Sequence, residues 1–257
     1  MDNLSLHGSA ASFVGKRSEN QDNLRFGCTC NFIDQKKPYA EKAIFSTEEP
    51  QLFCVCDGVG GEEFGDMASQ AALMGVKEYL GSGVCEDTLG DYVLHAAENA
   101  QRKVIGMYEQ LGMCGGTTLV MIGICGREFV SLNIGDSPLF LYHRKSDVLE
   151  ELSERHNEAW EAIRQGFDPQ ENDARSLCRC LGIDYPDFVE QVYMRSGVLE
   201  PGDTVMLCSD GVSEAFPEKL LKRKLKWRRK AGAICAAAGR VPHADNCTAI
   251  CLEVRKG

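Results

Sequence analysis

The 257-residue chain lacks any apolar run long enough to cross a bilayer, because its longest candidate, Leu119 to Cys125, has the length of a strand. The first ten residues, MDNLSLHGSA, lack the basic and then apolar regions that mark a secreted protein. No linker, low-complexity tract or repeat divides the chain. We therefore expect one globular domain, residues 1–257, located in the cytoplasm and without membrane contact.

The sequence also lacks the cysteine spacing of zinc and redox sites. Its thirteen cysteines occur singly or as the C-x-C pairs Cys28/Cys30, Cys54/Cys56 and Cys178/Cys180, never as C-x-x-C. Alternate residues of a strand face the same way, so such pairs are poorly placed to ligate zinc. We expect most of them to be small, reduced core residues.

Positive charge is scarce, and the formal net charge is −10. This balance argues against nucleic-acid binding, which depends on cationic side chains that displace counterions from phosphates. The exception is Lys219 to Lys230, with eight basic residues and no acidic one. Either this run is the solvated face of a helix anchored by Leu221 and Leu225, or it docks acidic or phosphorylated partners.

Apolar periodicity predicts two amphipathic helices, Gly65 to Leu80 and Asp91 to Leu111, side by side on a sheet, and a third helix from Pro217 to Ala238. The residues Ser12 to Phe26 have a hairpin-like pattern. Further short apolar segments predict seven strands: Leu52–Cys56, Thr117–Ile124, Phe129–Ile134, Leu139–His143, Gln191–Arg195, Thr204–Cys208 and Thr248–Val254. Of these, the three from Thr117 to His143 are expected to form an antiparallel meander.

Polar residues dominate from Leu149 to Gly182. We expect a mobile insertion there, with two short helices, Glu158 to Gln165 and Asp173 to Leu181. Most of this insertion, residues 153–182, has the position and composition of a flap.

The rest of the chain is organised around Leu52 to Gly61, LFCVCDGVGG. Asp57 follows a run that reads as a strand buried on both faces, and no Lys or Arg is adjacent to it. A carboxylate in such surroundings requires a cation or several hydrogen bonds, and a metal ion is the obvious candidate. The glycines that follow allow a ligand to approach bare backbone. Taken alone, the stretch also fits an ordinary Asp-Gly turn.

Four other aspartates, Asp22, Asp136, Asp210 and Asp245, also lie in turns beside predicted strands. Each alone is an unremarkable turn residue. Together they offer hard oxygen ligands without a competing His or Cys, which suits Mg²⁺ or Mn²⁺ better than Zn²⁺ or copper.

Six motifs occur in a telling order: GKRSENQD, VCDGVGG, GGTT, NIGDSPLFLY, LCSDGVSEA and ADNCT, with the weaker matches LSERH and LCRCLG between them. This series resembles the signature of the metal-dependent protein phosphatases of the PPM or PP2C type, in their compact bacterial form, over nearly the whole chain. The resemblance implies an α+β fold, a four-layer α-β-β-α sandwich of two antiparallel sheets flanked by helices, with a metal centre at one end.

The resemblance also implies the ligands of two Mn²⁺ or Mg²⁺ ions. Asp57 would bridge both ions, and the carbonyl of Gly58 would ligate one of them. Asp22 would hold that same ion, partly through water. Asp210 and Asp245 would complete the other.

Two further residues complete the implied site. Asp136 resembles the residue that binds a third, weaker ion in bacterial members, and Arg17 would grip the substrate phosphate. The implied reaction is hydrolysis of phosphoserine and phosphothreonine by direct attack of a metal-bridging hydroxide. Arg17 suits its role because its planar fork of donors matches two phosphate oxygens.

The chain departs from the family pattern at four positions. Val59 stands where eukaryotic members have a His proposed as general acid, and Gln21 where many members have Glu. Pro138 replaces a common Arg. Arg155 replaces a common Asp before His156. The last two bear on the flap and the third ion, and leave the two-metal core intact.

Two other functions fit parts of the sequence. A catalytically weak or inactive PP2C-like regulator would bind phosphoproteins without turnover, although such members usually lose metal aspartates. A metal-dependent nuclease is disfavoured by the acidic balance and by the lack of interleaved aromatic and basic residues. For the phosphatase we expect phosphoproteins made by a serine/threonine kinase as substrates, selected by the flap and the basic helix, and a monomeric enzyme.

Overall fold

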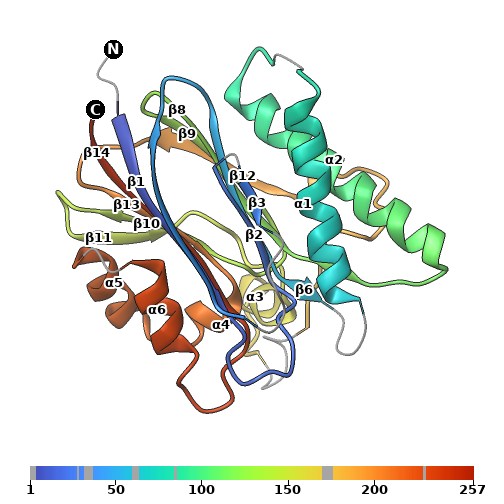
Figure 1. Ribbon diagram of the computed structural model, residues 1–257. Helices are drawn as coiled ribbons and strands as arrows, with labels where there is room; N and C mark the ends of the chain where they lie inside the picture. Colours follow the sequence, from blue (N-terminus) through green and yellow to red (C-terminus); the bar gives the residue numbers. More distant parts are fainter. Residues whose placement is uncertain are drawn as a thin grey trace.

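The computed structural model describes residues 4–27, 29–31, 37–59, 64–83, 86–169, 176–227 and 230–257. Within them, two six-stranded sheets pack face to face (Figure 1). All strand pairs are antiparallel. The first sheet has the order β11 (Val148–Glu151), β10 (Leu139–His143), β13 (Thr204–Cys208), β14 (Cys247–Lys256), β1 (Leu4–Phe13) and β4 (Tyr39–Ser46). The second has the order β12 (Tyr193–Val198), β9 (Glu128–Ile134), β8 (Leu119–Cys125), β5 (Gln51–Cys56), β2 (Asn23–Phe26) and β3 (Thr29–Asn31).

Helices cover the outer face of each sheet. The pair α1 (Gly65–Gly81) and α2 (Leu89–Leu111) packs on the second sheet, and α5 (Glu218–Lys226) with α6 (Ala231–Ala238) packs on the first. The predicted α-β-β-α order of layers is confirmed. Among the described helices, none has the length and apolar character that a membrane span requires.

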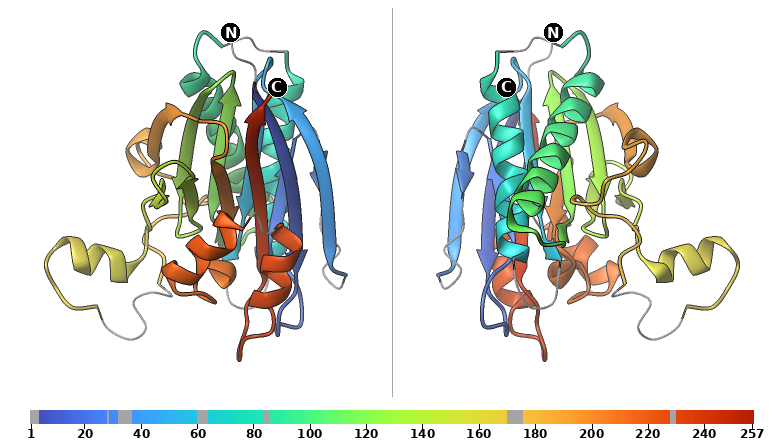
Figure 2. Two further views of the ribbon diagram at one scale, coloured as in Figure 1. Left: turned by 90° about the vertical axis from the view of Figure 1, so that its left-hand side faces the viewer. Right: turned by 90° about the vertical axis from the view of Figure 1, so that its right-hand side faces the viewer.

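The remaining elements are short and lie in the connections. They are α3 (Glu158–Arg164), α4 (Asp210–Ser213), the 3₁₀ turn η2 (Val189–Gln191) and the small ladder of β6 (Gly58–Val59) with β7 (Gly116–Thr117). Figure 2 shows α3 projecting away from the sandwich on its connecting segments. The predicted helix at Glu158 is therefore confirmed.

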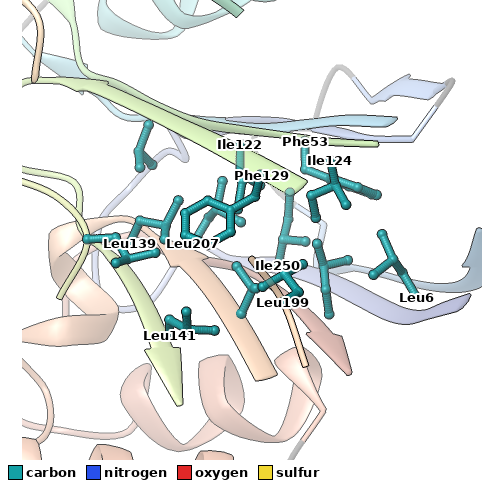
Figure 3. Close-up of a cluster of buried hydrophobic side chains, with 14 of the residues drawn as sticks. Leu6, Phe53, Ile122, Ile124, Phe129, Leu139, Leu141, Leu199, Leu207 and Ile250 are labelled. Carbon is teal, nitrogen blue, oxygen red and sulfur yellow. The ribbon is translucent and has the colours of Figure 1, made fainter. Parts of the chain in front are cut away.

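The main core lies between the two sheets (Figure 3). On β5, Phe53 and Val55 point into it, whereas Leu52, Cys54 and Cys56 point to α1 and α2. All five are buried, so this strand is enclosed on both faces as predicted. Full burial of one such large apolar side chain contributes about 1.5 to 3 kcal/mol. The described cysteines are free thiols, as expected.

Two predictions of strand pairing are wrong. Of the three strands in the predicted meander, only β8 and β9 pair with each other, because residues 135–138 carry the chain across to the other sheet, where β10 pairs with β13. In the same way β1 and β2, which flank the polar turn near the N-terminus, belong to different sheets. Local alternation shows that two strands are separated by a turn, but not whether the turn closes a hairpin or crosses the sandwich.

The predicted helix from Pro217 to Ala238 is two helices. Lys230 has an extended backbone, with ψ of 150°, and caps α6. The apolar stripe explains the break. A helix that continued past Leu221 and Leu225 would need another apolar residue near position 228 to stay packed on the sheet, but positions 228 and 229 are arginines. Those arginines lie outside the described residues.

The polar insertion also differs from expectation. Its first residues form β11, which pairs with β10. Residues 170–175 lie outside the described part, and residues 176–181 are not helical, so the second predicted helix is wrong where it can be examined. This stretch instead forms isolated bridges, Asn157 with Leu177 and Thr117 with Leu181.

Candidate metal centre

Strand register brings the predicted site residues to one end of the sandwich. Asp57 directly follows β5, Asp210 lies just past β13, and Asp22 and Asp245 lie just before β2 and β14. In antiparallel sheets the end of one strand lies beside the start of its neighbour. The pairs that show this are Asn23 with Cys56, Phe13 with Cys247, and Cys208 with Ala249.

Main-chain hydrogen bonds fix the backbone at Asp57. Its N–H donates to Thr118 Oγ1 at 3.0 Å, and its carbonyl accepts from Thr118 N and Thr117 Oγ1, each at 2.8 Å. At Gly58 an added Cβ would lie 2.2 Å from the carbonyl oxygen of Gly65. Only glycine fits at position 58, so an Asp-Gly sequence ends β5. Because these hydrogen bonds of Asp57 are made by its main chain, its side chain remains available to the site.

Asp22 is fully buried. Ser209 Oγ donates to its Oδ2 at 2.8 Å, which links a loop of the second sheet to the end of β13 in the first. Its Oδ1 is buried and has no hydrogen-bond partner in the described part of the chain. Burial raises the pKa of Asp22 to about 7, and the charges of Asp210 and Asp245 add to the rise. An orphaned, buried carboxylate oxygen is an atom that a cation would satisfy.

Asn246 holds the N-terminal loop beside the centre, a role that was not expected from the sequence. Its Nδ2 donates to the carbonyls of Val14 and Glu19, at 3.0 and 2.9 Å, and its Oδ1 accepts from Gln21 N at 2.9 Å. These three bonds set the position of the loop that carries Arg17.

Arg17 lies at the exposed rim of the centre. Its Nη2 contacts Asp245 Oδ2 at 2.5 Å, and its side chain is 62% exposed. The hydrogen bond and charge of Asp245 raise the pKa of Arg17, and the charges of Asp210 and Asp57 act in the same direction. The predicted phosphate-binding residue is therefore beside the predicted metal ligands.

Asp136 reaches the centre from the turn between the two sheets. Burial and the charge of Asp210 raise its pKa to about 7, while Asn157 and Arg155 lower it. The turn is held by two hydrogen bonds between Gly135 and His156. The ring Nδ1 of His156 accepts from the backbone N–H of Gly135 at 3.2 Å, and the backbone N–H of His156 donates to the Gly135 carbonyl at 3.1 Å. Burial lowers the pKa of His156 to about 4, so its ring is neutral and can accept this bond.

The five carboxylates act on one another. Burial raises the pKa of Asp57 well above its ordinary value, and the charges of the other four aspartates raise it further. Burial raises the pKa of Asp210 as well, and the charge of Asp245 adds to the rise. All five predicted aspartates therefore lie in a single site, although no group of three or more described His, Cys, Asp or Glu residues is arranged to hold an ion as it stands.

The fit of this site to a hard divalent cation follows from its chemistry. The clustered carboxylates repel one another, and one buried carboxylate oxygen lacks a partner among the described residues; a cation would relieve both. Oxygen-only ligands favour Mg²⁺ or Mn²⁺ over softer metals.

The fold and site define a four-layer α+β sandwich with an acidic centre at one end. Residues 40–241 match the sequence profile of the family described as protein phosphatase 2C, and the chain belongs to that family. The predicted resemblance is confirmed. Three of the predicted site residues, Arg17, Asp22 and Asp245, lie outside the matched range.

Relatives match a larger part of the chain. The serine/threonine phosphatase stp of Listeria innocua is 28% identical over 226 residues, covering 82% of this chain and 87% of the relative. The protein of the same name from Listeria monocytogenes is 29% identical over 230 residues, with the same coverages.

Solved structures share the fold over almost the full length. The catalytic domain of the serine/threonine protein phosphatase PstP, in complex with two manganese ions, has a TM-score of 0.76 at 22% identity, covering 98% of this chain and 99% of that one. The serine/threonine phosphatase of S. agalactiae has a TM-score of 0.77 at 18% identity, covering 96% and 99%. At these identities the likeness shows the fold.

Proposed function

We propose that this metal-dependent protein phosphatase hydrolyses phosphoserine and phosphothreonine with Mn²⁺ or Mg²⁺. The observation that carries the proposal is the set of five mutually repelling carboxylates, with an arginine at their rim, at one end of the sandwich. The names of the Listeria relatives support the substrate class, and the manganese ions of the PstP structure support the metal.

The residues fit two ions and a weaker third. Asp57, the Gly58 carbonyl, Asp22, Asp210 and Asp245 would hold the first two. Divalent ions bound there supply Lewis-acid activation of water and positive charge for the phosphate.

A third ion would be held at Asp136. The positive charge of Arg155 acts on both Asp136 and Asp210. Because this charge already offsets part of the negative charge, we expect the third ion to bind weakly.

Arg17 binds and orients the phosphate. Its bond to Asp245 uses one of five N–H donors and holds the guanidinium at the rim, so other donors can face a phosphate. A planar fork pairs with two phosphate oxygens, which a lysine cannot do. Asp22, which is fully buried, closes the inner side of the centre.

An inactive phosphoprotein-binding regulator is the weaker alternative, because every predicted metal aspartate is present and gathered in one site. Phosphoproteins of a serine/threonine kinase as substrates, substrate selection by residues 153–182, a monomeric state and a cytoplasmic location stay predictions.

The test is hydrolysis of an aryl phosphate and a phosphothreonine peptide with added Mn²⁺. We expect Asp57→Asn and Asp210→Asn each to lower kcat by about a thousandfold or more, as loss of a central catalytic group does, with an unchanged circular dichroism spectrum. The matched control is Asp87→Asn, which removes the same charge at an exposed site and leaves kcat unchanged. Undiminished turnover in excess chelator would contradict the proposal.

A further inference from the structure

A groove lies between α5 and α6 on the outer face of the first sheet. Its volume is about 230 Å³. Its walls combine apolar with cationic side chains, namely Leu220, Arg223, Lys224, Trp227, Ala233 and Ala237. Nothing in the proposed reaction uses this groove.

The two faces of α5 differ in charge. On one face Lys222 and Lys226 both pair with Asp147, at 3.3 and 3.1 Å, so much of their charge is offset within the protein. The other face presents Arg223 and Lys224 to the groove. Lys224 Nζ lies 4.3 Å from the centroid of the Phe216 ring, a cation–π contact.

Positive charge continues past the end of α5. Lys230 lies next to Lys42 of β4, and the like charge of Lys42 lowers the pKa of Lys230. In a chain of net charge −10, the α5 and α6 region is a local positive surface.

Trp227 supplies an apolar contact at the groove. Its side chain is 71% exposed, the highest value among the large exposed hydrophobic side chains described. Tryptophan and arginine are the residue types that most often dominate protein interfaces when they are buried by a partner. A groove that offers both is suited to an occupant with an apolar side chain and neighbouring carboxylates.

The groove also has a favourable position relative to the centre. The helix α4 begins with Asp210 and leads into α5, and the chain leaving α6 leads to Asp245. Figures 1 and 2 show α4, α5 and α6 grouped together, away from the labelled ends of the chain. A peptide bound along α5 and α6 therefore runs beside the loops that carry the metal ligands.

We propose that this groove docks an acidic, unphosphorylated segment of the phosphoprotein substrate, with an apolar side chain against Trp227 and carboxylates against Arg223 and Lys224. This inference rests on the proposed function, because it assumes that the protein acts on phosphoprotein substrates. Charge complementarity is the argument: an acidic phosphoprotein is repelled by most of this acidic chain and attracted here. An anionic membrane fits less well, because the site is concave and the protein as a whole repels such a surface.

Binding is measured with Trp227 as the reporter. The chain has two tryptophans, so Trp160→Phe leaves Trp227 alone. The probe is a short, unphosphorylated, Asp- and Glu-rich peptide with a single leucine. We expect a saturable blue shift of tryptophan emission that weakens in high salt and is lost when the leucine is replaced by serine.

Charge reversal then separates the groove from the general charge of the protein. In the Trp160→Phe background we expect Arg223→Glu to weaken peptide binding by about tenfold or more. The matched control is Lys77→Glu, which makes the same charge change at an exposed position of α1, on the opposite side of the sandwich, and leaves binding unchanged. Equal effects of the two variants, or no saturable shift, would overturn the proposal.

Turnover provides the second measurement. With a phosphopeptide that carries the acidic segment, Arg223→Glu is expected to lower kcat/KM about tenfold while aryl phosphate hydrolysis is unchanged. Because the binding probe has no phosphate, peptide binding without any turnover would contradict the proposed function but not the proposed docking groove. A blue shift with phosphatidylglycerol vesicles but not with the peptide would replace the proposed occupant with a membrane.

Discussion

The two halves of the acidic centre are built differently. Asp22, Asp57 and Asp210 stand at the ends of buried strands, and the bond from Ser209 to Asp22 joins loops of the two sheets. Asp136 belongs to a turn between the sheets that is tied to the segment carrying α3 through His156. We name these the strand half and the segment half.

The difference teaches which ligands are fixed by the fold. A side chain at the end of a central strand is positioned by the same packing that stabilises the domain. The turn that carries Asp136 is held by hydrogen bonds of Asn133 to Glu154 and of Gly135 to His156, just before a helix that projects from the sandwich (Figure 2). We therefore expect the strand half to be the permanent part of the centre, and the segment half to depend on the position of the predicted flap.

The largest expected effect compares one aspartate from each half. We expect Asp22→Asn to lower kcat for an aryl phosphate by about a thousandfold, and Asp136→Asn by about tenfold, at saturating Mn²⁺. In each case the amide keeps an oxygen that can accept a hydrogen bond, so the fold is retained. Equal losses in the two variants would mean that the halves do not differ in function.

A smaller effect concerns the pH dependence of stability without metal. The folded-state pKa values of Asp22 and Asp136 are about 7, above the value of 3.8 for an unperturbed aspartate. The folded protein therefore holds more protons than the unfolded chain between these values. The resulting stability is complete below about pH 4 and is lost as the pH rises through 7.

Urea unfolding in excess chelator measures this loss. We expect the free energy of unfolding to fall by about 1 kcal/mol between pH 6.5 and pH 8, a value reduced from the full linkage to allow for relaxation of the site. Below this range His156, whose pKa is lowered to about 4, has the opposite effect, and Asp147, whose pKa is lowered to about 2, does not contribute. Added Mn²⁺ should reverse the trend, because metal binding requires ionised carboxylates. An Asp22→Asn protein that keeps the full slope would refute the assignment.

The smallest effect tests Arg155, which brings a positive charge to the segment half. We expect Arg155→Asp to tighten the weakest Mn²⁺ site by about tenfold, because a cation is replaced by a carboxylate near Asp136. Calorimetric titration with Mn²⁺ measures the affinity and the number of ions without relying on activity. Arg155→Lys keeps the charge and serves as the control; an unchanged titration in Arg155→Asp would show that Arg155 has no influence on the third ion.

Much of the strand half could be predicted from local sequence. A buried apolar run followed by Asp-Gly indicates where a strand ends, and the antiparallel register then brings such ends together. Both long helices were also predictable from local sequence, because their apolar stripes are regular. Gly112, with φ of 64°, ends α2 at the position expected of a helix-terminating glycine.

The other features depend on contacts that local patterns do not encode. The assignment of β1 and β2, or of β9 and β10, to different sheets is decided by packing across the sandwich. Ser209, Asn246 and His156 act through hydrogen bonds to residues distant in the chain, so nothing beside them in the sequence marks their roles. The break before α6 had a signal, the arginines that interrupt the apolar stripe.

The placement of β1 between β4 and β14 has a consequence for biosynthesis. Leu4 pairs with Lys256, so the first strand remains an open edge until the last strand is made. Loop residue Arg17 likewise waits for Asp245. Contacts between such distant residues form slowly and leave partly folded chains prone to association. A growing polypeptide on the ribosome therefore carries an unfinished sheet and an unassembled centre, and it can gain activity only after the residues of β14 have been made.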